Sequence, residues 1–149
     1  MLMQDLAIQY QSGAIKVFQF FYNAIFPITQ LLANTAITIP IQIQADSDFV
    51  VRKSMVMAFS APGVPIPNPD FLISMYDTGS GKNWQDVPFT VNNSMGTAQL
   101  PFLWPEPQRV SANSTINVTL TNNLAIAALA YVTLSGMKVY QTGSGSGSC

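Results

Sequence analysis

The clearest pattern in the chain is a strict alternation of apolar and polar side chains over Ser114–Thr121. Its apolar positions are Ile116, Val118 and Leu120, and its polar positions include Thr115, Asn117 and Thr119. A period of two with β-branched residues predicts a strand whose apolar side faces a core and whose polar side faces solvent or a contact. Asn122 and Asn123 supply turn chemistry, so we expect this strand to end there.

A second strand is expected over Ala128–Tyr140, giving a hairpin or a Greek-key pair at the end of the chain. Its apolar positions are even-numbered up to Leu134 and odd-numbered from Met137 onwards. The change of parity falls at Gly136. One extra residue at a glycine inside a strand is typical of a β-bulge, so the sequence predicts a bulge at this glycine.

Two further strands are predicted upstream. Thr35–Ala45 alternates cleanly, with four isoleucines on its apolar face: Ile37, Ile39, Ile41 and Ile43. Pro40 has no N–H to donate, which predicts an edge strand or a break in pairing. Phe49–Phe59 follows, and the sequence predicts that Val51, Met55, Met57 and Phe59 share one register.

The remaining segments complete an all-β pattern. Ala14–Phe26 is rich in aromatic and β-branched residues and indicates a strand, although its alternation is imperfect and a helix stays open. Ala61–Asp70 contains four prolines and predicts a stiff surface loop. With short strands at Phe71–Tyr76 and Trp84–Val91, about eight strands separated by turns predict an antiparallel β-sandwich, a jelly roll being the favoured form.

This pattern divides the chain into three parts. Residues 1–26 are expected to be an N-terminal arm or a first strand, and residues 27–142 a β-sandwich domain. Residues 143–149 read Gly-Ser-Gly-Ser-Gly-Ser-Cys, which is typical of an engineered flexible linker ending in a thiol for conjugation. Asp5 stands where the positive region of a signal peptide would lie, so we expect no secretion signal.

Charge is unusually scarce. The chain has 13 charged residues, 9% of its length, against about 25% in an ordinary soluble domain. A surface this poor in charge favours a protein that covers itself with further copies or with a larger assembly, although a monomer coated in neutral polar groups is the alternative. Six scattered basic residues argue against nucleic-acid binding, and no segment is apolar enough to predict a membrane span.

Few residues are candidates for chemistry. The chain has no histidine, and its single cysteine lies in the tail, so we expect no thiolate metal site, no cofactor and no enzymatic activity. Gly79–Lys82 resembles part of a phosphate-binding loop but has the wrong glycine spacing and no helix after it, so a hairpin turn is expected. The aspartates at 46, 48, 70 and 77 are interpreted as turn residues rather than as ligands for Ca²⁺.

Aromatic residues offer two candidate surfaces. Five of them fall within nine positions and form either core or a subunit interface: Phe18, Phe20, Phe21, Tyr22 and Phe26. Trp84 and Trp104, with Tyr76, are either core or a platform on which a sugar ring stacks. The proline-rich loop Pro62–Pro69 would border that platform.

Several motifs resemble those of a known class of proteins. They are Asp48-Phe49, the segment Asp70–Lys82, Pro105-Glu106-Pro107, the strand Ala112–Asn122 and the closing Gly136–Tyr140. Together they resemble small jelly-roll-like structural proteins of tailed bacteriophages, over about Thr35 to Tyr140. The resemblance implies a capsid accessory or decoration protein located in the virion, and it brings no catalytic residues.

The expected function is therefore that of a structural virion protein that self-associates, for example as a trimer, and packs on a phage particle. Its expected partners are copies of itself and the major capsid protein or other virion proteins, without nucleic acid or membrane. The N-terminal arm is predicted to make contacts between subunits. Two alternatives stay open: a receptor- or carbohydrate-binding module, and a self-assembling shell or filament subunit.

Overall fold

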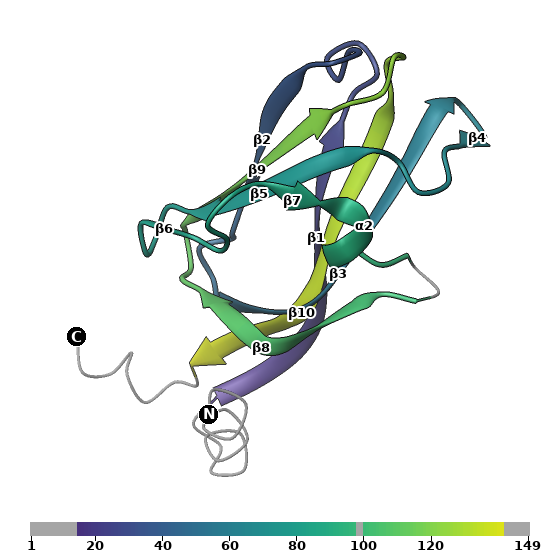
Figure 1. Ribbon diagram of the computed structural model, residues 1–149. Helices are drawn as coiled ribbons and strands as arrows, with labels where there is room; N and C mark the ends of the chain where they lie inside the picture. The colour runs from purple at the N-terminus through teal and green to yellow at the C-terminus, as the bar shows by residue number, and fades with distance from the viewer. Residues whose placement is uncertain (1–14, 98–99, 142–149) are drawn as a thin grey trace.

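The computed structural model describes residues 15–97 and 100–141, which form two layers of strands (Figure 1). The strands are β1 (Ile15–Phe26), β2 (Ala36–Gln42), β3 (Asp48–Ala61), β4 (Val64–Pro65), β5 (Phe71–Asp77), β6 (Lys82–Asn83), β7 (Phe89–Thr90), β8 (Phe102–Val110), β9 (Thr115–Asn122) and β10 (Leu129–Gln141). Helix in this part of the chain is confined to the four-residue α2 (Val91–Ser94).

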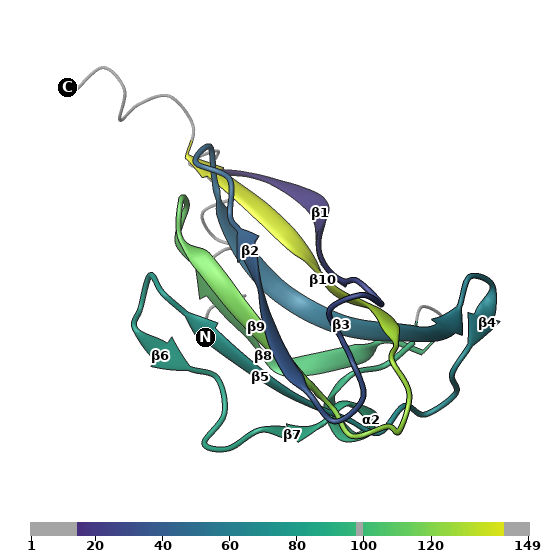
Figure 2. The same cartoon turned by 90° about the horizontal axis from the view of Figure 1, so that it is seen from above.

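Each layer is a five-stranded antiparallel sheet. The first has the order β1-β10-β3-β4 with β8 also paired to β3, and the second has β2-β9-β5-β6 with β7 also paired to β5. The pairs are nested: β1 with β10, β2 with β9, β3 with β8, and β5 with β6 and β7. A long hairpin rolled into two facing sheets in this way is a jelly roll. The predicted all-β sandwich of this type is confirmed, and Figure 2 shows the layers from above.

Strand alternation builds the core between the sheets. Buried and half-buried residues alternate without exception along β9, as its sequence pattern predicts. The largest fully buried side chains come from both layers: Phe26, Phe49 and Leu134 from the first sheet, and Phe71, Ile73, Ile116 and Leu120 from the second. The second sheet therefore buries its aliphatic positions and turns Thr115, Asn117, Thr119 and Thr121 of β9 to its outer side.

Strand β2 lies at the edge of the second sheet, where it pairs with β9. Pro40 stands opposite Asn117, and the register continues through this pair without a shift. A proline removes one backbone donor, which an edge strand tolerates because one of its sides has no partner strand in the sheet. The predicted edge position is confirmed.

The predicted bulge is present beside Gly136, but its extra residue belongs to the partner strand. Ser135 pairs with Lys53 and Gly136 pairs with Val51, so Arg52 is the additional residue and it lies in β3. Against β1, strand β10 keeps an unshifted register throughout. The prediction that β10 itself carries the extra residue is therefore wrong, and beyond Gly136 both Lys138 and Val139 are buried, at 4% and 3% exposed.

The same bulge inverts the faces of β3. Before it, Phe49 and Val51 are fully buried, and after it the buried positions become Ser54 and Ala58. Met57 is 51% exposed. The prediction that Val51 shares a face with Met55, Met57 and Phe59 is thus wrong, because one inserted residue moves every later side chain to the opposite side of the sheet.

The N-terminal part of the described chain belongs to the sandwich. Ile15–Phe26 is a strand that pairs with β10 along its whole length, from Ile15 opposite Gln141 to Phe26 opposite Ala130, so it is not a helix. Residues 1–14, which include most of the predicted arm, lie outside the described residues. The tail at 143–149 lies outside them as well.

Candidate functional site

The aromatic cluster of β1 is split between core and surface. Tyr22 and Phe26 are 7% and 0% exposed and belong to the core, so they offer no free surface. Phe20 is half-buried, with the Lys138 ammonium 4.2 Å from its ring centroid. Phe18 and Phe21 are more than half exposed and point to opposite faces of the strand. An interface through this cluster stays a prediction for these last two residues.

The outer side of the first sheet carries an apolar face. It comprises Phe21 and Ile25 of β1, Met55, Met57 and Phe59 of β3, and Tyr131 of β10. Phe21, Ile25 and Met57 are 54%, 49% and 51% exposed. Phe59 and Tyr131 stack edge to face with ring centroids 6.1 Å apart. The sequence pattern missed this face because the Arg52 bulge moves Met55, Met57 and Phe59 out of the core.

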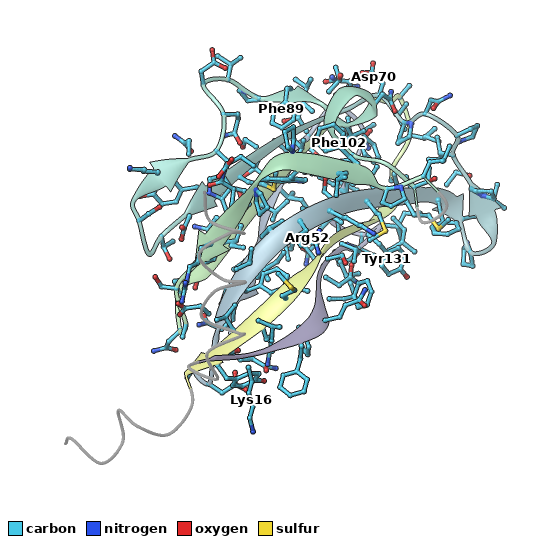
Figure 3. The ribbon with its side chains drawn as sticks, turned by 90° about the horizontal axis from the view of Figure 1, so that it is seen from below. Lys16, Arg52, Asp70, Phe89, Phe102 and Tyr131 are labelled. Carbon is cyan, nitrogen blue, oxygen red and sulfur yellow. The ribbon has the colours of Figure 1, made fainter. Side chains whose placement is uncertain are left out.

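Two cationic side chains lie near this apolar face, at the bulge. Arg52 is half-buried and Lys53 is exposed, and both lie on β3 beyond one end of the apolar face. Figure 3 labels Arg52 and Tyr131 on the neighbouring strands β3 and β10. A polar pair lies within the face: the Thr133 hydroxyl donates a hydrogen bond of 2.9 Å to the side-chain oxygen of Asn23.

The outer side of the second sheet is neutral and polar instead. Thr38 and Thr119 share a hydrogen bond of 2.7 Å across β2 and β9. Thr115 donates to the Gln42 side-chain oxygen at 2.9 Å on the same pair of strands. These hydroxyls and amides are water-compatible, so the two outer sides of the sandwich differ sharply in character.

The two tryptophans meet at the open edge between the sheets. Trp84 follows β6 of the second sheet, Trp104 lies on β8 of the first, and their ring centroids are 5.3 Å apart at an interplanar angle of 85°. Both rings are half-buried against the core and also line a surface hollow of about 610 Å³. The same pair of rings therefore packs on the core and borders a solvent-open hollow.

The other members proposed for the platform lie elsewhere. Tyr76 is 38% exposed and alternates with the buried Met75 and Asp77, so it points to the outer side of β5. The loop residues Pro65–Pro69 line a separate hollow with Asn92 and Met95. In Figures 1 and 2, β4 beside this loop and β6 beside Trp84 lie on opposite sides of the molecule.

The aspartates serve local structure. Asp48 accepts hydrogen bonds from Arg109 at 2.9 Å and from the Ala112 backbone at 2.8 Å. Asp77 accepts from the Gly79 backbone and the Ser80 hydroxyl within the turn after β5, where Gly81 has a positive φ of 70°. Across residues 15–97 and 100–141, no three carboxylate or other metal-ligating side chains gather into a cluster.

A buried lysine forms a network that the sequence pattern did not predict. The Lys138 ammonium donates to the side-chain oxygen of Gln44 and pairs with Asp46 at 3.3 Å. The Tyr140 hydroxyl donates to the other oxygen of Asp46 at 3.0 Å. Lys138 keeps the even parity of the buried positions Ala130, Val132 and Leu134, because β10 has no extra residue against β1.

The network shifts two pKa values. Burial raises the pKa of Asp46, but hydrogen bonds from Tyr140, Lys138 and Ser47 outweigh it, so the net pKa lies below its ordinary value. Burial lowers the pKa of Lys138, but its hydrogen bond to Asp46 and nearby charge raise the net pKa above its ordinary value. Both groups are therefore held in their charged forms, which suits a structural ion pair.

No helix within the described residues combines the length and the apolar character that crossing a membrane requires.

Comparison with known proteins places the chain in no family. No family model matches it, and no curated protein does. Among solved structures, it is similar to the infectious bursal disease virus VP2 subviral particle and to the Gt strain of the same virus, each at 12% identity and a TM-score of 0.36. The match covers 87% of this chain and 34% and 32% of those chains, so the chain spans about a third of their length. Similarity at this level identifies neither a family nor a function.

Proposed function

We propose that this protein is a structural subunit of a virus particle, a capsid accessory or decoration protein that associates with copies of itself. The observation that carries the proposal is the apolar face on the outer side of the first sheet. Exposed apolar side chains gathered on one side of a charge-poor protein mark a contact surface. The motif resemblance to phage structural proteins supports the same role.

A second copy of the chain is the occupant that best suits this face. Arg52 and Lys53 lie about five residues, roughly 16 Å, along β3 from Met57. A two-fold axis near Met57 and Tyr131 would therefore hold the cations of the two copies roughly 30 Å apart, well beyond the Debye length of about 8 Å. Apolar side chains would meet at the axis, and the Thr133 hydroxyl and the Asn23 side-chain oxygen would already be paired with each other there.

The area of the apolar face determines how strongly two copies of the chain are expected to associate. The side chains of the face span five residues of β1 (Phe21–Ile25) and five of β3 (Met55–Phe59), and three strands over that length cover about 17 Å by about 14 Å, or about 240 Å². A stable interface buries about 800 Å² per partner. The face alone therefore supports weak, concentration-dependent pairing, which suits a subunit whose contacts are reinforced by a larger assembly.

Light scattering and sedimentation of the purified chain, with Cys149 reduced, test the proposal. We expect association that increases with concentration and is lost in Met57→Lys, because a buried ammonium without a partner is costly. Ala36→Lys is the matched control, since it adds the same charge at an exposed position of the second sheet.

Two outcomes would contradict self-association through the apolar face. A monomer at every concentration, or equal behaviour of Met57→Lys and Ala36→Lys, would remove the support for self-association through this face. Circular dichroism of both variants checks that the fold is intact, because an unfolded variant would lose association for an unrelated reason.

A further inference from the structure

We propose that the hollow beside Trp84 and Trp104 binds carbohydrate, with the two indoles as the apolar surface and the side chains of Lys82, Asn83 and Glu106 as its hydrogen-bonding rim. This site is independent of the apolar face and adds a ligand-binding activity to the proposed structural role.

The hollow lies where the two sheets separate. One wall comes from the turn and short strand after β5, with Asp77, Ser80 and Lys82–Trp84, and the other from β8, with Trp104–Glu106, Gln108 and Arg109. Its volume is about 610 Å³, against about 410 Å³ and 300 Å³ for two other hollows of the described surface. Small-ligand sites commonly occupy about 300–1,000 Å³, so one or two sugar rings fit.

Hydrogen bonds fix the Trp104 indole directly and the backbone that carries the Trp84 indole. The Trp104 indole N–H donates to the Ser54 hydroxyl at 2.9 Å, and the Trp84 backbone N–H donates to the Met75 carbonyl at 3.1 Å. Their edge-to-face contact fixes each ring against the other. A sugar ring presents C–H groups on one face and hydroxyls around its rim, so a fixed indole beside free polar groups matches both parts of such a ligand.

The polar side chains divide into a fixed set and a free set. Asp77 is committed to the Gly79 and Ser80 hydrogen bonds, and Arg109 to its ion pair with Asp48 at 2.9 Å. The side chains of Lys82, Asn83 and Glu106 make no hydrogen bond or ion pair with another described residue and are exposed at the rim. An ammonium, a carboxamide and a carboxylate together supply both donors and acceptors to hydroxyl groups.

Strand β8 makes a detour that forms one wall. Val51 pairs with Gln108, and Lys53 pairs with Leu103, so the four residues Trp104–Pro107 stand opposite the single residue Arg52. Pro105 and Pro107 restrict the backbone of this segment. The detour leaves Trp104 and Glu106 in a preorganised position at the hollow, which lowers the conformational cost of binding.

The charge of the lining favours a neutral ligand. Lys82 and Arg109 balance Asp77 and Glu106 in the wall, so the hollow offers no net attraction to a phosphate or to a strongly anionic chain. A neutral hexose oligosaccharide is therefore the ligand class that we assign. A proline-rich peptide, which also stacks on indoles, is the competing ligand class and serves as an outcome of the test.

Intrinsic fluorescence gives a direct test, because the chain contains two tryptophans and both line the hollow. The probes are maltohexaose, cellohexaose and mannohexaose, titrated to concentrations on the order of 10 mM. A Kd of about 1 mM is a binding free energy of only about 4 kcal/mol, and saturating such a site requires ligand well above the Kd. We expect one of them to produce a saturable change in emission. Glu106→Gln and Asn83→Ala should each weaken binding about tenfold while leaving the melting temperature unchanged.

Asp70→Asn is the matched control, because it changes an exposed carboxylate that does not line the hollow, and its affinity should equal that of the starting chain. The proposal is overturned if none of the sugars changes the emission, if the rim variants bind as tightly as Asp70→Asn does, or if a polyproline peptide saturates the signal and the sugars do not. Failure of self-association would leave this result untouched, so the two proposals are tested separately.

Discussion

Gly136 of β10 lies so close to Val50 of β3 that a β-carbon on the glycine would stand 1.8 Å from the Val50 carbonyl oxygen. The close approach occurs at the bulge where Arg52 is inserted. Two backbones can come this near only when one of the residues has no side chain. The contact therefore ties the identity of one residue to the inversion of β3 that exposes Met57.

Replacing this glycine should be costly. Gly136→Ala forces backbone atoms apart, since the obstacle is a carbonyl group rather than a flexible side chain. We expect a loss of about 3 kcal/mol in the free energy of unfolding, at the upper end for overpacking, measured by urea denaturation. Gly63→Ala is the control: its β-carbon would meet open space but its φ is 75°, so only about 1 kcal/mol of backbone strain is expected. Equal losses at the two sites would contradict the close approach.

A buried amide gives a second prediction. The Asn122 side-chain nitrogen donates to the carbonyl oxygens of Leu31, Leu32 and Ile126, and its oxygen accepts from the Leu124 backbone. Asn122→Asp keeps the shape but places a carboxylate against three carbonyl oxygens. We expect a loss of about 3 kcal/mol at neutral pH.

The pH dependence of that variant has a definite sign. Burial and the three carbonyl oxygens raise the pKa of the new carboxyl in the folded state, so the stability of the variant is highest below the unfolded pKa of about 4 and falls as pH rises from there through the raised folded pKa. Urea denaturation of Asn122→Asp at several pH values checks this. A loss that is the same at pH 3 and pH 7 would show that charge is not the cause.

The Lys138 network predicts a different pH profile. The pKa of Asp46 is lowered in the folded state, so its contribution is present above its unfolded value and is lost as pH falls through the folded one. The pKa of Lys138 is raised, so its contribution is present below its unfolded value and is lost as pH rises through the folded one. The stability difference between the starting chain and Asp46→Asn should therefore shrink in acid.

A double-mutant cycle isolates the pair. In a Lys138→Met background, the effect of Asp46→Asn should lose part of its pH dependence, because the ammonium is one of the groups, with Tyr140 and Ser47, that hold the carboxylate charged. An effect of Asp46→Asn that is independent of Lys138 would assign the shift to Tyr140 and Ser47 instead.

The sequence predicted those parts of the fold that depend on local alternation. Strand β9 and the isoleucine face of β2 follow from a period of two, and the edge position of β2 follows from the missing N–H of Pro40. The faces of β3 could not be predicted in the same way, because the bulge is set by the partner strand at Gly136. Nothing in the local sequence around Arg52 shows that it is the inserted residue.

The candidate sites likewise depend on contacts between segments that are distant in the sequence, which the local pattern does not predict. The pairing of Trp84 with Trp104 depends on contact between two sheets, and a list of aromatic residues does not predict which of them meet. Tyr76 fell on the wrong side of β5 for the predicted platform because it neighbours the buried Met75 and Asp77 in a strand. The apolar face could not be predicted either. Without the Arg52 bulge, the alternation places Met55 and Met57 on the same side as the buried Val51.

The strand order has a consequence for synthesis of the chain. Strands β9 and β10 come last in the sequence, yet each lies in the interior of its sheet, between β2 and β5 and between β1 and β3. Until β9 and β10 have left the ribosome, the earlier strands lack their main neighbours. The backbone edges of β1, β2, β3 and β5 are then unpaired. Completion of both sheets must then wait until β9 and β10 have been synthesised, and it proceeds through contacts distant in sequence, which is slow and exposes the nascent chain to aggregation. A holding chaperone would be needed most in that interval.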